Sequence, residues 1–319
     1  MPAKFLWALA AIPSVLSATI QGFNYGSQGM NQETFVQRFQ LAQNLDNTGS
    51  RFSAARLYTM IEDGTVNTPI SAFAAAIATK TRLLLGIWCS AGQAAVTNEI
   101  DAFVSALQQY GSDLTDLLDG ISVGSEDLYR ISPTGLENHS DPGADPDTLV
   151  EYINQLKAAI AGTSAAGVPI GHVDTWTAWV NNSNQAVVVA CDWIGVDGYP
   201  YWQTVNDNDI SNAKQLFFDS YDATVDAASG KPVWVTETGW AVDGPTENAA
   251  VANIANAKRY WDEVGCALFG KTNVWWYTLE DAGAVPSFGI VGSSLTNPPL
   301  FDLTCPNGTS GKSVPSSSA

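Results

Sequence analysis

The sequence predicts a single closed α/β barrel, in which eight parallel strands alternate with helices. Short apolar runs typical of buried strands recur eight times, and longer segments with helical periodicity separate them. The length of 319 residues fits one barrel of this kind. An open, doubly wound sheet has a similar element order and is the alternative architecture.

The expected strands are short, apolar and bounded by turn residues or by the start of a helix. In chain order they span residues 20–25, 53–58, 82–88, 120–124, 169–174, 193–199, 232–237 and 273–279. The expected helices between them span 32–45, 70–79, 98–109, 147–161, 209–227 and 246–264. Segment 147–161 has the clearest pattern. Leu149, Ile153, Leu156 and Ile160 recur there at helical spacing, and Asp147 or Thr148 is available to cap the start.

The two ends of the chain differ in composition from the barrel. Residues 1–18 combine Lys4 with an apolar stretch and a small-residue cleavage site, which is typical of a secretory signal peptide. We expect the barrel domain to span residues 19–306, and the Ser, Gly and Pro-rich residues 307–319 to form a flexible tail. No later run reaches 18 apolar residues, which predicts a soluble, secreted protein without a transmembrane segment. Sequons for N-glycosylation occur at Asn138, Asn181 and Asn307.

The charge balance excludes several classes of partner. The formal net charge of -18 would repel nucleic acid and anionic membranes. The chain contains neither a dinucleotide-binding glycine motif nor a phosphate-binding loop, and its cysteines and histidines do not form a metal-binding pattern. We therefore expect a monomer that needs no cofactor and no metal.

Four cysteines in a secreted chain allow three full pairings. Cys89 follows the third expected strand and Cys191 precedes the sixth, so a parallel barrel places them at opposite ends, too far apart for a disulfide. We predict one disulfide between Cys266 and Cys305, with Cys89 and Cys191 as free, buried thiols.

Two expected strands each deliver one carboxylate at their C-terminal end. Residues 232–237 end in Glu237, and residues 120–124 are followed by Ser125 and Glu126. For one such carboxylate, a structural ion pair is as good an explanation as chemistry, because burial of a charge is costly. A barrel brings the ends of its fourth and seventh strands to the same mouth, and two carboxylates are the minimum for acid-assisted hydrolysis of a glycosidic bond. A carboxyl separation of about 5 to 5.5 Å predicts retention of configuration, and about 6.5 to 9.5 Å predicts inversion.

Several segments together carry a resemblance to a known family. They are GFNYG at 22–26, SAARLY at 53–58, VGSEDLYR at 123–130, HVDTW at 172–176, DGYP at 197–200, PVWVTETGW at 232–240 and FDL at 301–303. The chain resembles glycoside hydrolase family 17, the β-1,3-glucanases, and most closely its fungal cell-wall members. This resemblance implies a (β/α)₈ barrel, retention of configuration, Glu126 as general acid/base and Glu237 as nucleophile. The chain departs from many relatives at Ala241, where they carry Pro, and at Ser125, where related barrels often carry Asn.

Eleven tryptophans and ten tyrosines suit a carbohydrate cleft, because aromatic faces pack on sugar rings. The side chains that we expect to bind substrate are Arg56, Tyr58, Tyr199, Tyr201, Trp202, Trp240 and Glu280. We further expect Arg56 or Tyr199 to stabilise the charge of Glu237. Trp176 and Trp179 are equally compatible with a subsite and with the core.

The predicted function is hydrolysis of internal bonds of β-1,3-glucan, by a secreted protein of the fungal cell wall. One alternative is a transglycosylase that passes the same covalent intermediate to another glucan, and a second is a non-catalytic glucan-binding protein. Ser-His-Asp hydrolysis is disfavoured, because the chain lacks a G-x-S-x-G motif and His139 lies in a polar loop. We expect His172 to be structural, while Glu280 fits a substrate contact and a salt-bridged rim carboxylate equally well.

Overall fold

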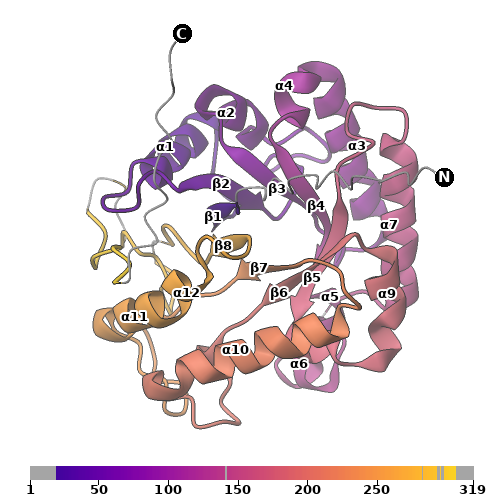
Figure 1. Cartoon of the computed structure of the whole chain (residues 1–319). Helices are drawn as coiled ribbons and strands as arrows, with labels where there is room; N and C mark the ends of the chain where they lie inside the picture. The colour runs from indigo at the N-terminus through magenta and orange to yellow at the C-terminus, as the bar shows by residue number, and fades with distance from the viewer. Residues whose placement is uncertain (1–18, 141, 282, 293–294, 296–297, 307–319) are drawn as a thin grey trace, which may run out of the picture.

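The computed structural model describes residues 19–140, 142–281, 283–292, 295 and 298–306 (Figure 1). The expected signal peptide, the tail at 307–319 and the sequon at Asn307 lie outside these residues. Among the described helices, none is both long and apolar enough to cross a membrane.

Eight parallel strands close into a barrel in chain order, with helices around it (Figure 1). They are β1 (Gln21–Tyr25), β2 (Phe52–Leu57), β3 (Arg82–Ile87), β4 (Leu118–Ser125), β5 (Ile170–Thr175), β6 (Trp193–Asp197), β7 (Val233–Glu237) and β8 (Val274–Trp276). Pairing of β8 with β1, with Gln21 opposite Val274, closes the ring. The predicted (β/α)₈ barrel is therefore confirmed, and the open sheet is excluded.

Long helices follow most of the strands, and short helical turns lie in the connections at both ends of the barrel. They are α1 (Gln32–Gln43), α2 (Ala72–Thr79), α3 (Gln93–Tyr110), α4 (Ser112–Thr115), α5 (Asp127–Arg130), α6 (Pro133–Glu137), α7 (Pro146–Ile160), α8 (Trp176–Trp179), α9 (Gln185–Ala190), α10 (Ile210–Ala227), α11 (Ile254–Tyr260), a π-helix (Trp261–Gly265) and α12 (Cys266–Leu268). Two 3-10 turns lie at Asn182–Asn184 and Pro200–Trp202.

The expected helix 246–264 is wrong in its first part. Residues 246–253 form a loop in which Glu247 and Ala250 exchange backbone hydrogen bonds of 3.0 Å. The helix begins only after Asn253, whose side chain accepts the backbone N–H of Asn256 at 2.8 Å. An asparagine at this position is a strong N-cap, and it sets the start of α11.

Indole rings fill the N-terminal half of the barrel. Trp193, Trp234 and Trp275 meet there, with a separation of 4.1 Å between the ring centroids of Trp193 and Trp234. Gly171 makes room for them, because a methyl group at its position would lie 2.5 Å from the Trp193 ring. The interior is thus a packed core, and a functional cleft has space only at the C-terminal ends of the strands.

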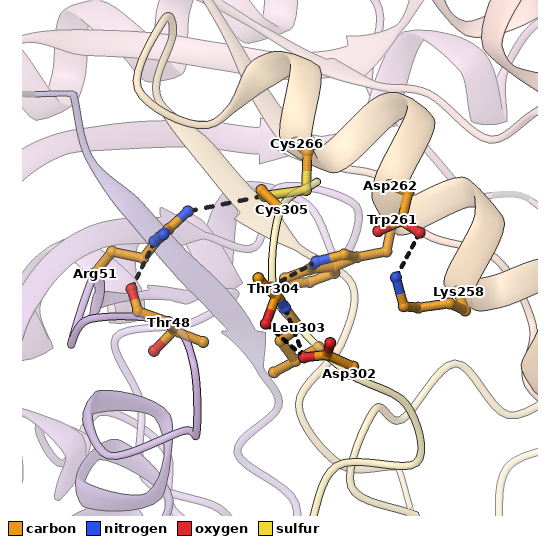
Figure 2. Close-up of a disulfide and its surroundings, with 10 residues drawn as sticks. All are labelled: Thr48, Arg51, Lys258, Trp261, Asp262, Cys266, Asp302, Leu303, Thr304 and Cys305. Carbon is orange, nitrogen blue, oxygen red and sulfur yellow. Dashed lines mark hydrogen bonds and ion pairs between the residues drawn. A yellow bond between two sulfur atoms is a disulfide. The ribbon is translucent and has the colours of Figure 1, made fainter. Parts of the chain in front are cut away.

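A disulfide joins Cys266 and Cys305, with a distance of 5.5 Å between the α-carbons (Figure 2). Trp261 donates its indole N–H to the carbonyl of Leu303 at 3.2 Å, which fixes the same segment. Closing a loop of 39 residues is worth about 4 kcal/mol through the entropy of the unfolded chain. The predicted pairing is confirmed, and the two other cysteines are free and buried, as expected.

Candidate active site

Glu126 and Glu237 both lie at the mouth formed by the C-terminal ends of the strands. Glu237 is the last residue of β7, and Glu126 directly follows β4 and precedes α5. Both line one cavity of about 920 Å³ at this mouth. The barrel therefore brings together two carboxylates that are 111 residues apart in sequence, as the strand order predicts.

Three donors hold the carboxylate of Glu237. Arg56 and Tyr58 donate to its Oε1, each at 2.6 Å, and Tyr199 donates to its Oε2 at 2.7 Å. Hydrogen bonds to both oxygens, one of them from a cation, favour the ionised form of a carboxyl group. The expected contact of Arg56 and Tyr199 with this glutamate is present. Arg56 is buried and does not line the cavity, so its expected contact with substrate is corrected.

Arg56 is itself buried and oriented by further acceptors. Its Nη1 donates to Asn24 Oδ1 at 3.1 Å, and its Nη2 donates to Ser125 Oγ at 3.0 Å. Ser125 thus binds the arginine that binds Glu237 and links the end of β4 to β2. Ser125 therefore helps to orient Arg56, and this role does not require contact with a sugar.

Glu126 has a different environment. Its backbone is in the left-handed conformation, with φ of 59°, and its N–H donates to the carbonyl of Val173 at 2.8 Å. About 27% of its side chain is exposed, and within the described residues its one ion-pair contact is Arg130 at 4.0 Å. Burial, followed by the charges of Glu237 and Asp174, raises the pKa of Glu126 well above that of a free glutamate.

A third carboxyl group, Asp197, lies in the same cavity at the end of β6. Thr236 donates to its Oδ1 at 2.7 Å, and Arg56 Nη1 lies 3.9 Å from the same atom. Burial and the charge of Glu237 raise the pKa of Asp197 well above its ordinary value. A raised pKa favours the neutral form of Asp197, in which it competes less with Glu237 for the buried Arg56. The sequence offered a signal for this residue, because Asp197 also ends an apolar strand.

The predicted aromatic residues fall into two groups. Tyr58, Tyr199 and Trp202 line the cavity, and Trp202 is 45% exposed. Tyr201 and Trp240 do not line it. Both are buried, and their polar ends bind backbone carbonyls: Tyr201 donates to Pro245, and Trp240 donates to Val251 at 3.0 Å. Their expected contact with substrate is therefore corrected. They pack against each other beneath the cleft, with a centroid distance of 5.5 Å.

Two further tryptophans line the cavity. Trp176 is one of them, and for this residue the sequence was equally compatible with a subsite and with the core. Trp179, in contrast, is buried and donates its indole N–H to the Gly195 carbonyl at 2.8 Å. Trp88 was not predicted as a site residue. It lines the cavity directly after β3, and the Arg130 guanidinium lies 5.2 Å from its ring centroid. Its place at the end of a barrel strand is the signal that could have identified it.

A second cavity of about 670 Å³ extends from the first toward β1 and β8. Tyr58, Trp88 and Tyr277 line both cavities, so the two form one groove across the mouth. Glu280 lines the second cavity and binds Arg38 of α1 at 2.6 Å. The salt-bridged rim position foreseen for Glu280 is thus present. In the described part of the chain, no group of three or more His, Cys, Asp or Glu side chains could hold a metal ion.

A closed (β/α)₈ barrel with two carboxylates at its mouth is typical of the glycoside hydrolases. The match with known proteins narrows this class. The chain belongs to the BtgE/BtgC glycoside hydrolase family, whose domain matches residues 22–287.

Curated relatives and solved structures agree with this family. A probable glucan endo-1,3-beta-glucosidase of Aspergillus fumigatus is 58% identical over 94% of this chain and 68% of its own length. A glucan 1,3-beta-glucosidase of Schizosaccharomyces pombe is 31% identical over 70% of this chain and 67% of its own length. The glycoside hydrolase family 17 beta-1,3-glucanosyltransferase from Rhizomucor miehei has the same fold, with a TM-score of 0.72 at 24% identity over 90% of this chain and 98% of that chain. The family resemblance seen in the sequence is confirmed, and the protein is a glycoside hydrolase.

Proposed function

We propose that the protein hydrolyses internal bonds of β-1,3-glucan with retention of configuration. Glu237 acts as the nucleophile and Glu126 as the general acid/base. The observation that carries this assignment is the unequal environment of the two carboxyl groups. Three donors favour the ionised form of Glu237, whereas the raised pKa of Glu126 keeps a proton available for the leaving group.

The reaction takes two steps. In the first, Glu237 attacks the anomeric carbon while Glu126 gives its proton to the departing glycosidic oxygen, and a glycosyl ester forms on Glu237. The ester is neutral, so the charge of Glu237, which adds to burial in raising the pKa of Glu126, is gone and this pKa falls. In the second step, the ionised Glu126 takes a proton from water, which attacks the anomeric carbon; the bond to Glu237 breaks, its carboxylate forms again and the sugar is released.

The substrate follows from the relatives and from the shape of the groove. Relatives that are 51% to 58% identical are named probable glucan endo-1,3-beta-glucosidases. A groove that crosses the mouth and continues on both sides of Tyr58, Trp88 and Tyr277 suits a chain that is cut internally. Exposed aromatic faces such as that of Trp202 suit sugar rings.

A second candidate activity is transfer of the glycosyl group to another glucan. The continuation of the groove beyond the two glutamates leaves room for an acceptor sugar on the side opposite the donor. Incubation with a short β-1,3-oligosaccharide separates the activities. We expect shorter products, and products longer than the substrate would establish transfer.

Stereochemistry tests the proposed mechanism. Proton NMR of a digest should show the β-anomer of the new reducing end first, before mutarotation. Adding azide to a Glu126→Ala variant should give a β-glycosyl azide, and adding it to Glu237→Ala should give an α-glycosyl azide, because azide attacks opposite faces of the sugar in the two variants. An α-anomer as the first product of the wild-type enzyme would overturn the retaining mechanism.

We also propose that the protein is a secreted monomer that acts at the cell wall, with residues 19–306 as its catalytic domain. Asn138 and Asn181 are exposed and offer sites for glycans. Asn138 lies at the rim of the cavity, where its side chain donates to Tyr129 at 2.9 Å. Mass spectrometry of the secreted protein, before and after removal of glycans, tests the cleavage site and the occupancy of both sequons.

A further inference from the structure

His172 of β5 is buried between two oxygen atoms. Its Nδ1 lies 2.6 Å from the carbonyl oxygen of Val123, and its Nε2 lies 3.0 Å from Asp174 Oδ2. A carbonyl oxygen can only accept a hydrogen bond, so Nδ1 carries a hydrogen. The charge of the ring therefore depends on whether Asp174 accepts from Nε2 or donates to it.

The contacts of Asp174 answer this question. Its Oδ2 accepts the backbone N–H of Leu128 at 2.9 Å, and its Oδ1 accepts those of Tyr129 at 3.2 Å and Thr175 at 2.8 Å. Three N–H donors favour a carboxylate over a protonated carboxyl. Nε2 then also carries a hydrogen, and His172 is an imidazolium.

A second carboxylate faces the same ring. A methyl group at Gly124 would lie 2.3 Å from Asp127 Oδ2 and 2.9 Å from His172 Cε1, so both side chains pack against this glycine. Burial alone would lower the pKa of His172, but the hydrogen bond and charge of Asp174 and the charge of Asp127 raise it above the ordinary value. Burial raises the pKa of Asp127, and the charge of His172 counteracts this rise. One buried cation thus lies beside two buried carboxyl groups.

These carboxylates hold the backbone on both sides of Glu126. Asp127 Oδ2 accepts the N–H of Ser125 at 2.9 Å, and Asp174 Oδ2 accepts that of Leu128. Glu126 lies between these anchors in the left-handed conformation, with φ of 59°, which is uncommon for a residue other than glycine. The conformation persists because the surrounding hydrogen bonds fix it.

We propose that His172 is a protonated positioning residue, which holds Asp174 and Asp127 as carboxylates and through them fixes the turn that presents Glu126. It does not touch substrate. The proposal deepens the proposed function and rests on Glu126 as the acid/base. It goes beyond the expectation of a structural histidine, because it assigns a charge to His172 and a consequence for proton transfer.

The charge is measured directly in the folded protein. The chain has two histidines, so ¹⁵N-histidine labelling gives the signals of four ring nitrogens, and His139→Gln assigns the two that belong to His172. We expect both ring nitrogens of His172 to be protonated at pH 6, in the wild type and in Glu237→Gln alike. An unprotonated ring nitrogen at pH 6 would overturn the proposal whether or not the catalytic assignment holds.

The role in positioning is tested by the leaving group. His172→Gln should lose about 10²-fold or more in kcat/KM on β-1,3-glucan but far less on a dinitrophenyl β-laminaribioside, whose leaving group needs no proton. Asp174→Asn should show the same dependence on the leaving group, and it replaces His172→Gln in the test if that variant does not fold. Equal losses on both substrates would mean a general structural role and refute the positioning role.

Glu126→Gln is the reference variant. If it shows the same dependence on the leaving group, Glu126 is the acid, and the His172 result can be judged separately. If Glu126→Gln loses kcat/KM equally on both substrates, the proposed function fails, while the measured charge of His172 still stands on its own.

Discussion

Glu126 and Glu237 occupy similar places in the barrel but have opposite surroundings. Each lies at the C-terminal end of an apolar strand, at the same mouth. Glu237 receives three hydrogen bonds, whereas within the described residues the carboxyl of Glu126 receives none and has a cation only at 4.0 Å. The strands therefore fix where the two carboxyl groups lie, and the hydrogen-bond donors around each group make their environments different.

Replacing Glu237 by Gln should have the largest effect. Without a nucleophile, kcat on glucan should fall by about 10⁴-fold or more. The pKa of Glu126 should fall as well, because the charge of Glu237 helps to raise it. NMR titration of ¹³C-labelled glutamate in wild type and variant measures this shift, and an unchanged Glu126 titration would show that the two groups are not coupled.

Replacing Arg56 by Lys should come next, with a loss of about 10²-fold in kcat/KM. The ammonium group keeps the charge but loses the planar fork that joins Glu237, Asn24 and Ser125. The nucleophile is then held less firmly, so the loss should appear in kcat on glucan more than in KM. A raised KM with an unchanged kcat, in a folded variant, would argue against Arg56 as a group that holds the nucleophile.

Replacing Tyr58 or Tyr199 by Phe should have a smaller effect. Each change removes one hydrogen bond to Glu237, which corresponds to about a 10- to 100-fold loss in kcat/KM for a bond to a charged group. Tyr201→Phe is the matched control, because its hydroxyl binds the Pro245 carbonyl instead. A loss in Tyr201→Phe as large as in Tyr199→Phe would show that the effect does not depend on contact with Glu237.

Replacing Arg130 by Gln should have the smallest effect and acts on the other carboxyl group. The charge of Arg130 lowers the pKa of Glu126, but the pair is long and partly exposed. Because activity requires a protonated Glu126 and is lost as pH rises through its pKa, the basic limb should move slightly upward. A downward shift in the pH profile of kcat/KM would contradict the assignment of this limb to Glu126.

The sequence predicted the barrel well, because every barrel strand is an apolar run that local composition identifies. It did not predict α5 or α8, since four residues are too few to show helical periodicity. The helical periodicity over residues 246–264 predicts too early a start, because Asn253 caps the helix and delays its beginning.

The site was predictable where strand direction decides it and less so in the turns. Glu126 and Glu237 were found because parallel strands bring their C-terminal ends together. Tyr201 and Trp240 were misplaced, because the direction of a side chain after a strand depends on tertiary packing and not on a local repeat. Asp197 also ends an apolar strand, but its place beside Arg56, 3.9 Å from Nη1, is set by the closed barrel and not by the local sequence.

The C-terminal segment is bound to the end of the barrel opposite the groove. Asp302 binds Asn47 at 3.2 Å, and Arg51 lies 3.9 Å from the sulfur of Cys305. Both partners lie just before β2, at the end of the barrel opposite the groove, and the disulfide fixes the chain there. A support attached behind Cys305 would therefore hold the molecule by its base, with the groove facing outward toward an insoluble glucan surface.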